Sequence, residues 1–391
     1  MNRILVLNNV SETGLKLFGD AYQIGPNVTD PEAVIVRSAE VDTDRYQSLI
    51  AVARAGAGVN NISVAKATEK GVCVFNTPGA NANAVAELVF IMLGLYARRV
   101  DQALRFVQML DGDDAAIAAR VEAGKSKFTG FELAGKTLGI VGLGKVGVLV
   151  ANAGIERGMK VIGYDAFPTL TNMHELSPQV QIARRMQEVL LVADVFSVHV
   201  PLSEKTKNLI GVDQVALMKS DCILMNYARD GICDDAAILE ALNIGKVKAF
   251  ITDFPTKALL GNAGVICTPH LGASTAESEE NCAIMAARQL KNYLEYGIVT
   301  NSVNFPAIEI FPTQAIRSRL AIVNRDVPNM IAAITGVLGE AGVNIQAFTN
   351  ESNGRIGYNL VDIEADVNDE VIERIRQLPK VLRVRALKFS K

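Results

Sequence analysis

The chain has 391 residues, of which 49% are hydrophobic and 6% aromatic, and its formal net charge is −3. This length is enough for two or three domains, and the absence of a basic run excludes the clustered Lys and Arg typical of nucleic-acid binding. The longest apolar helix expected, 84–96, is too short to span a bilayer. Five cysteines without a C-x-x-C pair are typical of buried thiols in a reducing cytoplasm. We therefore expect a cytoplasmic protein with no metal, membrane or nucleic-acid partner.

Residues 1–92 alternate strand-like apolar runs with helix-like stretches. The strands are expected at 4–7, 33–36, 51–55 and 72–75. This alternation predicts a parallel, flavodoxin-like α/β domain that has no glycine fingerprint of its own. The helix expected at 84–96 is more apolar than a lone surface helix should be, so it predicts a homo-oligomer, either a dimer or a tetramer.

A glycine fingerprint, Gly142-x-Gly144-x-x-Gly147, stands in the middle of the chain. The strand, helix and strand around it are expected at 138–141, 146–157 and 160–164, and Asp165 follows the second strand. Such glycines let the backbone approach a pyrophosphate, and the helix N-terminus offers free N–H groups to its phosphates. Asp165 would accept hydrogen bonds from the ribose hydroxyls and repel a 2′-phosphate, so the pattern predicts a Rossmann domain that binds NAD rather than NADP.

Further strands extend this Rossmann pattern into a doubly wound sheet of six or seven strands. They are expected at 195–199, 222–226, 249–252 and 265–268. A long helix pattern at 276–296 would return to the first domain. The sequence thus predicts a discontinuous substrate domain, 1–92 and 276–305, with the cofactor domain 93–275 inserted in it.

The C-terminal segment, 317–391, has a different pattern and follows a proline-containing linker, 306–316. Strands are expected at 320–322, 343–345, 358–363 and 382–387, and helices at 330–338 and 371–375. The order βαββαβ predicts a small, separately foldable ferredoxin-like domain.

Two polar groups follow strands of the predicted Rossmann sheet. Arg229 follows the strand 222–226, and His270 follows the strand 265–268. Ligands of open α/β sheets bind beyond the carboxyl ends of the strands, so both side chains would face the cofactor crevice. An imidazole can take the hydroxyl proton of a secondary alcohol, and a guanidinium can hold a carboxylate and the forming carbonyl. The alternatives are a surface ion pair for Arg229 and a capping role for His270.

Several short motifs support a more specific reading. They are Val36-Arg37-Ser38-Ala39, Arg54-Ala-Gly-Ala-Gly-Val-Asn, Asn76-Thr-Pro-Gly, Val85-Ala-Glu-Leu, His199-Val-Pro-Leu, Asn226-x-x-Arg229 and Thr268-Pro-His270-Leu-Gly-Ala-Ser-Thr. With the fingerprint, they make the chain resemble the D-2-hydroxyacid dehydrogenase family over essentially its whole length, and the C-terminal segment resembles the ACT fold. The resemblance implies NAD-dependent oxidation of 3-phospho-D-glycerate to 3-phosphohydroxypyruvate, the first step of L-serine biosynthesis.

The resemblance also implies roles for individual residues. His270 would be the general acid/base, and Arg229 the anchor of the carboxylate and carbonyl. The substrate contacts would be Arg37, Ser38, Arg54 and Asn81. The cofactor contacts would be Ala57, Gly142, Gly144, Lys145, Val146, Gly147, Asp165, Val200, Tyr227, Ala228, Arg229, Asp253, His270 and Gly272. An L-serine effector would meet Asn324, Asp326 and Asn344 between two ACT-like domains.

The chain departs from the family pattern after Asp253. The family has a Glu there that hydrogen-bonds the catalytic His, whereas this chain has Lys257 and Ala258 at or near that position. Either another acid such as Asp230 or Glu277 supplies the carboxylate, or His270 works unpaired with a lower pKa, or activity is reduced. Two alternatives therefore stay open: an enzyme of the same family that acts on another 2-hydroxy or 2-oxo acid, and an NAD(H)-sensing binding protein without turnover.

Overall fold

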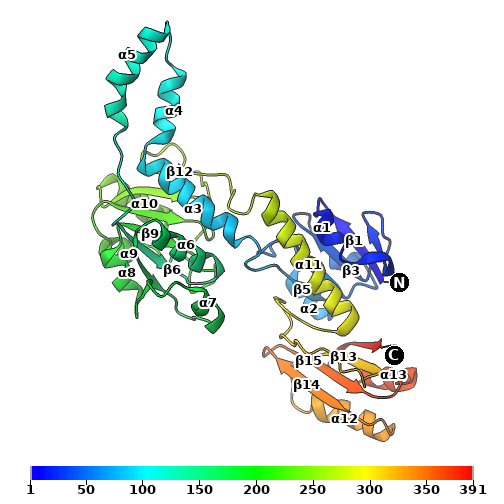
Figure 1. The fold of residues 1–391 in the computed structure, drawn as a ribbon. Coiled ribbons are helices and arrows are strands. Elements are labelled where there is room, and N and C mark those ends of the chain that lie inside the picture. The colour runs from blue at the N-terminus through cyan, green and yellow to red at the C-terminus, as the bar shows by residue number, and fades with distance from the viewer. Residues whose placement is uncertain (1, 390–391) are drawn as a thin grey trace. The chain divides into compact units, whose positions relative to one another are not determined.

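The computed structural model describes residues 2–389, and the chain divides into two compact units (Figure 1). One unit consists of Met1–Asn81 and Ala276–Lys391, and the other of Ala82–Thr275. The predicted boundary between residues 92 and 93 falls inside a helix, α3 (Ala82–Ala97). The finer division into substrate, cofactor and C-terminal domains stays a prediction.

The first unit begins with a five-stranded parallel sheet in the order β2-β1-β3-β4-β5. Its strands are β1 (Asn2–Leu7), β2 (Tyr22–Gly25), β3 (Ala33–Val36), β4 (Ala51–Arg54) and β5 (Cys73–Phe75). This is the flavodoxin-like strand order, as predicted. The edge strand β2 was not predicted, because its four residues, Tyr-Gln-Ile-Gly, lack the buried apolar run of the inner strands.

Helices cover this sheet on both faces. They are α1 (Glu12–Leu15), α2 (Val64–Glu69) and α11 (Ala276–Tyr296), with short 3₁₀ segments at Gly19–Ala21 and Thr43–Arg45. The long helix α11 has the bounds that the sequence predicts. Its buried face, which includes Ala286, Ala287 and Leu290, packs with residues of β1, β3 and β4 in one core.

The C-terminal part of the first unit is a four-stranded antiparallel sheet in the order β14-β15-β13-β16. The elements are β13 (Ser318–Arg325), α12 (Met330–Glu340), β14 (Ala347–Ser352), β15 (Ile356–Ile363), α13 (Asp369–Arg376) and β16 (Val381–Lys388). Their order is the predicted βαββαβ. The predicted strand at 343–345 is wrong in position, because Val343 and Ile345 lie in the segment before β14.

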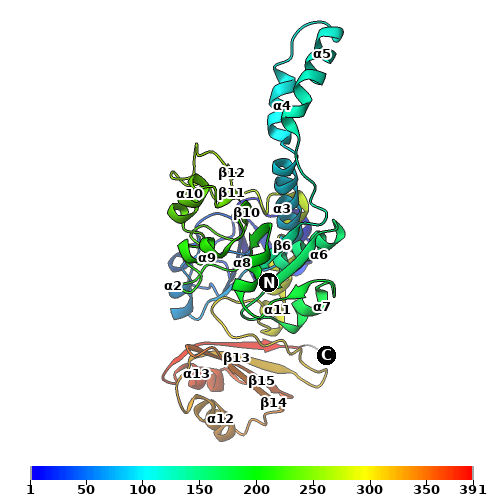
Figure 2. The same ribbon diagram turned by 90° about the vertical axis from the view of Figure 1, so that its left-hand side faces the viewer.

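The two faces of this antiparallel sheet are covered differently (Figure 2). On one face, Leu320 and Ile322 pack against α12 and α13. On the other face, Ala321 and Tyr358 share a core with α11 and the five-stranded sheet. The second face of the C-terminal sheet is therefore buried against α11 and the five-stranded sheet of the same unit.

A buried arginine, Arg319, connects the C-terminal sheet with the end of α11. Arg319 is 0% exposed, and its Nε and Nη2 donate to Asp362 Oδ1 and Oδ2 at 2.6 and 2.8 Å. Its Nη1 donates to the carbonyls of Tyr296 at 3.0 Å and Ile310 at 2.7 Å. Nearby, Arg385 donates to the carbonyls of the last turn of α11. Cations there are favourable, because the C-terminal end of a helix carries partial negative charge.

The second unit contains a seven-stranded parallel sheet in the order β12-β11-β10-β9-β6-β7-β8. Its strands are β6 (Thr137–Val141), β7 (Lys160–Tyr164), β8 (Gln181–Ile182), β9 (Val195–Val198), β10 (Cys222–Asn226), β11 (Val247–Thr252) and β12 (Val265–Cys267). The doubly wound sheet was predicted, although the two-residue edge strand β8 was not. Chain order reverses between β6 and β9, and ligands of such sheets bind at that point.

Helices pack on both faces of this sheet. Besides α3, they are α6 (Lys145–Glu156), α7 (Leu170–Glu175), α8 (Met186–Val192), α9 (Val212–Leu217) and α10 (Asp235–Asn243). The core on one side contains residues of α3 and α6, and the core on the other contains residues of α8, α9 and α10.

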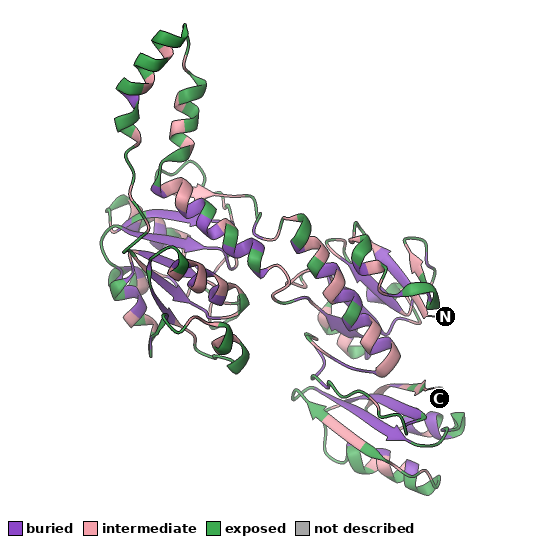
Figure 3. Cartoon of the chain, viewed as in Figure 1, coloured by how far each residue is buried: buried purple, intermediate pink, exposed green. Residues whose placement is uncertain are grey.

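The apolar character of helix α3, from which we expected an oligomer, has another explanation. Val85, Val89 and Leu93 are at most 6% exposed and pack in the same core as α6, so the apolar character of this helix is explained by burial within its own unit. Apolar side chains are exposed at Ile91 of α3, at 60%, and further along on the helical arm formed by α4 (Val100–Gln108), α5 (Asp114–Gly124) and a 3₁₀ turn, Lys125–Phe128. This arm extends away from the seven-stranded sheet (Figures 1 and 3). In the described part of the chain, every helix falls short of the length and apolarity needed to cross a membrane.

Candidate active site

The glycine fingerprint forms the turn between β6 and α6. Gly142 has φ +94°, and a Cβ atom there would lie 2.6 Å from the carbonyl oxygen of His199. A Cβ at Gly147 would lie 1.9 Å from the carbonyl oxygen of Gly142, so no larger residue fits. These glycines bring the start of α6 against the strand end and leave its first N–H groups without intrahelical partners, as a dinucleotide pyrophosphate requires.

Asp165 is fixed beside this turn at the end of β7. Its Oδ2 accepts from the N–H of Leu143, and its Oδ1 accepts from the N–H of Phe167, both at 2.7 Å. Val200 also borders the turn, because its Cγ1 lies 3.0 Å from the Cβ position of Gly142. Lys145, in the first turn of α6, pairs with Glu175 at 2.7 Å. The structure thus brings the predicted pyrophosphate and ribose residues together, and this arrangement fits NAD.

The loop after β10 presents Arg229. The buried Asn226 closes this loop, because its Nδ2 donates to the carbonyl of Arg229 at 2.9 Å and its Oδ1 accepts from Ala228 N at 3.1 Å. The Arg229 Nη1 donates to the Ala228 carbonyl at 2.7 Å. Within the described residues, no carboxylate pairs with this guanidinium, and burial lowers the pKa of Arg229. The predicted surface ion pair, the alternative for this residue, is absent.

The loop that carries His270 is organised by Asp253, which is 2% exposed. Its Oδ1 accepts from Thr268 Oγ1 at 2.6 Å and from Leu271 N at 2.8 Å, and its Oδ2 accepts from Gly272 N at 2.7 Å. These bonds show a role that the sequence did not predict: Asp253 holds the histidine loop. The expected contact of Asp253 with the cofactor stays a prediction.

His270 itself has a left-handed backbone, with φ +56°, and its N–H donates to the Asp253 carbonyl at 3.1 Å. Its imidazole packs edge-to-face against the ring of Phe254, with centroids 5.0 Å apart and an interplanar angle of 61°. Within this unit, no described side chain hydrogen-bonds the imidazole, and that includes Asp230. Glu277 belongs to the other unit, so its pairing with His270 stays a prediction.

A second histidine, His199, lies below the glycine turn. Its Nε2 is 2.8 Å from Ser197 Oγ, and its Nδ1 is shielded from water and has no partner among the described groups. Burial lowers the pKa of His199 to about 4. The side chain is therefore neutral at physiological pH and supports the turn from beneath. Tyr227, predicted to line the crevice, is 6% exposed and packs in the core under α3.

The first unit carries a small polar pocket at the ends of β1 and β3. This cavity of about 280 Å³ is lined by Asn8, Asn9, Arg37 and Ser38. Asn8 has φ +67°, and its Oδ1 accepts from the backbone N–H groups of Ser38, at 3.2 Å, and of Ala39. Sequence reasoning identified Arg37 and Ser38 but missed the two asparagines. The signal that could have found them is their place directly after a parallel strand.

The remaining predicted substrate residues of this unit have defined local contacts. Arg54 Nε donates to the Arg37 carbonyl at 2.9 Å, so the two arginines are neighbours. Ala57 accepts from Asn76 Nδ2 at 2.6 Å through its carbonyl. Their contacts with substrate and cofactor, and those of Asn81, stay predictions.

The three predicted effector residues do not gather within one chain. Asn324 is 2% exposed and accepts from Asn359 Nδ2 at 2.7 Å, and Asp326 accepts from the Ser352 hydroxyl. Asn324 pairs with Gly357 at the start of β15. Asn344 lies toward the opposite end of that strand, two residues before Gln346, whose N–H donates to the Asp362 carbonyl at 2.9 Å. Asn329 has φ +73° at the start of α12. Asn is among the residues that tolerate this conformation.

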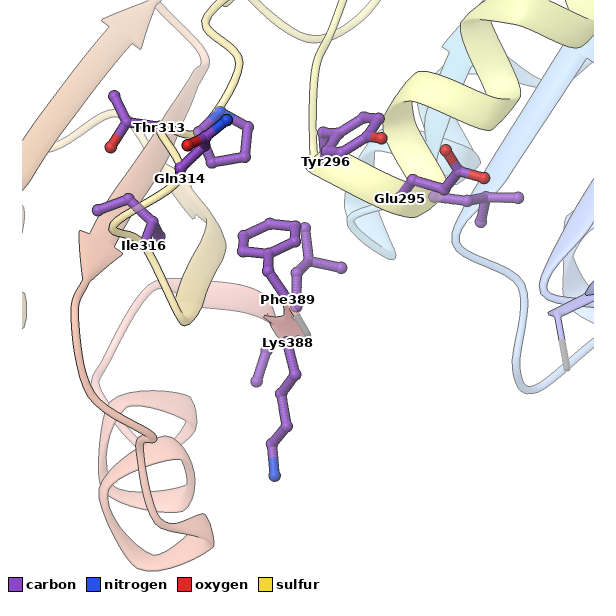
Figure 4. Close-up of a pocket in the computed structure, with 11 residues that line it drawn as sticks. Glu295, Tyr296, Thr313, Gln314, Ile316, Lys388 and Phe389 are labelled. Atoms are coloured by element: carbon purple, nitrogen blue, oxygen red, sulfur yellow. The ribbon is translucent and has the colours of Figure 1, made fainter. Parts of the chain in front are cut away.

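A large cavity of about 1010 Å³ lies in the first unit, beside the end of α11 (Figure 4). Tyr296, Thr313, Gln314 and Phe389 are among its lining residues. Tyr296 packs on Phe389 with ring centroids 6.1 Å apart. None of the predicted site residues lines this cavity, so its size alone does not mark it as the site.

Comparison with known proteins agrees with this geometry. Residues 96–272 match the family model of the D-isomer specific 2-hydroxyacid dehydrogenase, NAD binding domain, which confirms the prediction of an NAD-binding domain. A D-3-phosphoglycerate dehydrogenase of Escherichia coli is 30% identical over 385 residues, covering 94% of this chain and 90% of that protein. One of Methanocaldococcus jannaschii is 35% identical over 329 residues, or 79% of this chain.

The chain spans only 60% of the length of that Methanocaldococcus relative. Among solved structures, the NAD⁺-bound 3-phosphoglycerate dehydrogenase of Entamoeba histolytica is similar with a TM-score of 0.61 and 27% identity. The similarity covers 78% of this chain and 98% of that one. The predicted family resemblance is confirmed by these matches.

Proposed function

The chain belongs to the D-2-hydroxyacid dehydrogenase family, and from that premise we propose that it oxidises 3-phospho-D-glycerate to 3-phosphohydroxypyruvate with NAD, the first step of L-serine biosynthesis. The observation that carries the proposal is the half-buried Arg229, which has no carboxylate partner among the described residues, on the same sheet edge as the glycine turn and the His270 loop. A shielded cation without a counter-ion is suited to an anionic ligand. The relatives named D-3-phosphoglycerate dehydrogenase support this substrate.

The proposed chemistry divides between two side chains. His270 takes the proton of the C2 hydroxyl group as hydride leaves the same carbon, and it returns that proton in the reverse reaction. Arg229 binds the substrate carboxylate and the oxygen that becomes the carbonyl, which fixes the reacting carbon and stabilises developing charge. NAD, when bound, supplies the hydride acceptor. Asp253 keeps the imidazole loop in place through its three hydrogen bonds.

Arg37 and Arg54 provide the phosphate specificity in this proposal. They are adjacent on one unit, and Arg37 lines a pocket with the amide side chains of Asn8 and Asn9. Each charge-assisted hydrogen bond to a phosphate contributes about 1.5 to 3 kcal/mol. A family member acting on a 2-hydroxy acid without a second anionic group would have no use for this cluster.

One observation favours a second candidate, an NAD(H)-binding protein with weak or no turnover. The His270 imidazole has an aromatic ring, Phe254, as its neighbour and no carboxylate within its unit. Without a carboxylate, nothing fixes the tautomer or stabilises the charged imidazole formed during oxidation. Such a protein would bind NADH normally and leave the substrate unchanged.

A single assay separates these candidates. NADH oxidation is followed with phosphohydroxypyruvate, with hydroxypyruvate and with pyruvate, and NADH binding is measured by fluorescence in parallel. We expect turnover that prefers the phosphorylated substrate and is abolished in His270→Ala, with NADH affinity preserved. Wild-type turnover no faster than that of His270→Ala would support the sensing protein, and a preference for an unphosphorylated acid would support another dehydrogenase.

We further propose that the C-terminal βαββαβ domain is an ACT domain and that L-serine binds between two copies. The position of Asn344, far from Asn324 within one chain, is compatible with a site shared by two subunits. Exposed Leu104, Val107 and Met109 on the helical arm, at 57 to 70%, support a homodimer or homotetramer. Calorimetry with L-serine and, as control, D-serine tests the effector; no heat with millimolar L-serine, or a monomer in sedimentation, would contradict the respective proposal. A cytoplasmic location also remains a prediction.

A further inference from the structure

The pocket formed by Asn8, Asn9, Arg37 and Ser38 has an acidic neighbour on helix α11. Arg37 Nη2 lies 2.6 Å from Glu279 Oε1, and both residues belong to the same unit. Glu279 is in the first turn of α11, and its side chain is 42% exposed, against 37% for Arg37. The cation that the proposed function assigns to a substrate anion is therefore already paired with a carboxylate.

A structural ion pair is a weak explanation for this contact. Exposed salt bridges contribute about 0 to 1 kcal/mol, so little stability depends on it. The backbone around Arg37 is fixed by other bonds, since its carbonyl accepts from Arg54 Nε and the next N–H donates to Asn8. Glu279 is thus not needed to hold the strand end, but its negative charge lies where an incoming anion must approach.

We propose that Glu279 is an internal counter-anion of Arg37, which the phosphate of the substrate must displace or share, and that this residue sets the selectivity for phosphorylated over unphosphorylated substrates. This inference rests on the proposed function and deepens it. Glu279 acts through Arg37 and through its own charge, so it is a positioning residue and not a catalytic one. While the pocket is empty, it keeps the guanidinium neutralised; when the substrate arrives, it lowers the affinity for the phosphate.

The sign of the effect follows from charge alone. Replacing Glu279 by Gln keeps the length of the side chain and an amide oxygen that can still accept from Arg37, but it removes the negative charge beside this guanidinium. Between charges several ångströms apart in partly exposed surroundings, the repulsion removed corresponds to roughly a three- to tenfold gain in affinity. The gain must fade with salt, because charges at this separation are screened when the Debye length falls to about 3 Å at 1 M.

The experiment compares the wild type, Glu279→Gln and the matched control Glu280→Gln as full chains. Steady-state rates with NADH are measured for phosphohydroxypyruvate and for hydroxypyruvate, at 0.05 M and 1 M NaCl. For Glu279→Gln at low salt, we expect a KM for phosphohydroxypyruvate three- to tenfold lower, kcat within about twofold, and an unchanged KM for hydroxypyruvate. At 1 M NaCl the two KM values for phosphohydroxypyruvate should converge, and Glu280→Gln should behave as the wild type.

Other kinetic results would overturn either this inference alone or the proposed function as well. A KM for phosphohydroxypyruvate that is unchanged or raised in Glu279→Gln overturns the inference, as does an equal gain for both substrates or a gain that persists at 1 M NaCl. The proposed function would survive these results, because the wild type would still turn over. Absence of wild-type turnover with either substrate overturns the proposed function and, with it, this inference.

Discussion

Arg229 and Arg319 are both shielded from water, but their surroundings are opposite. In the C-terminal sheet, every guanidinium nitrogen of Arg319 donates to another group of the protein, with two bonds to Asp362 and two to backbone carbonyls. Arg229, at the edge of the seven-stranded sheet, has one bond to a neighbouring carbonyl and no carboxylate among the described residues. A shielded charge whose partners are all internal stabilises the fold, whereas one left incomplete is available to a ligand. His199 is intermediate in this respect, because one of its ring nitrogens has a hydrogen-bond partner among the described groups and the other has none.

The largest effect predicted from this contrast is on catalysis. Replacing Arg229 by Gln removes the cation that binds the substrate carboxylate, and two charge-assisted bonds at about 1.5 to 3 kcal/mol each correspond to a loss of roughly a hundredfold to ten-thousandfold in kcat/KM. The melting temperature should hardly change, because Arg229 completes no internal network. Steady-state kinetics and calorimetric melting of the same sample test both parts. If the variant lost stability as well as activity, Arg229 would have a structural role like that of Arg319, and the prediction would be wrong.

The reverse pattern is predicted for Arg319. Replacing it by Met leaves the Asp362 carboxylate buried without its partner, which should lower the free energy of unfolding of that unit by about 3 to 5 kcal/mol. Denaturant unfolding followed by circular dichroism measures this loss. The double variant Arg319→Met/Asp362→Leu is the control, and it should recover most of the stability because no unpaired charge remains. Equal stability of the single variant and the wild type would show that Asp362 finds another partner.

A smaller effect is predicted for His199, and it depends on pH. Burial lowers the pKa of His199 to about 4 in the folded chain, whereas an unfolded histidine has a pKa of about 6.5. The unfolded state therefore binds a proton first, so the contribution of this residue is complete above pH 6.5 and is lost as the pH falls towards 4. At pH 5 the loss amounts to about 2 kcal/mol.

The measurement compares the unfolding free energies of the wild type and of His199→Asn at pH 7 and pH 5. The wild type should lose about 2 kcal/mol more than the variant over this interval, since carboxylates elsewhere titrate alike in both. Parallel losses would mean that His199 is protonated in the folded state and that its free ring nitrogen finds a partner.

The sequence predicted those features that local patterns determine. The parallel α/β character of both sheets followed from the alternation of apolar runs with helix-like stretches, and the fingerprint located the turn that only glycine can form at Gly142 and Gly147. Strand ends are also local, so Arg229 and His270 were expected beyond the ends of two strands of the Rossmann sheet. The family resemblance added Arg37 and the motifs around all three residues.

Other features depend on partners distant in sequence and could not be predicted in this way. The pairing of Arg37 with Glu279 joins residues more than 200 positions apart, and Asp253 acts through a loop that it meets only after folding. The apolar helix α3 was taken as a subunit interface, because a sequence shows hydrophobicity but not which surface covers it. The short edge strands β2 and β8 lack the run of buried apolar residues that marks an inner strand, so they gave no signal.

The core that the C-terminal sheet shares with α11 limits how this segment could have been gained in evolution and how it could be transferred by protein engineering. Since Ala321 and Tyr358 pack in one core with α11, excision of residues 317–391 would uncover apolar surface on both fragments. The segment is thus a poor candidate for transfer by simple gene fusion, despite its compact βαββαβ order. Any ancestral gain or loss of this module would have required compensating substitutions on α11, and covariation between these two surfaces among relatives would record that history.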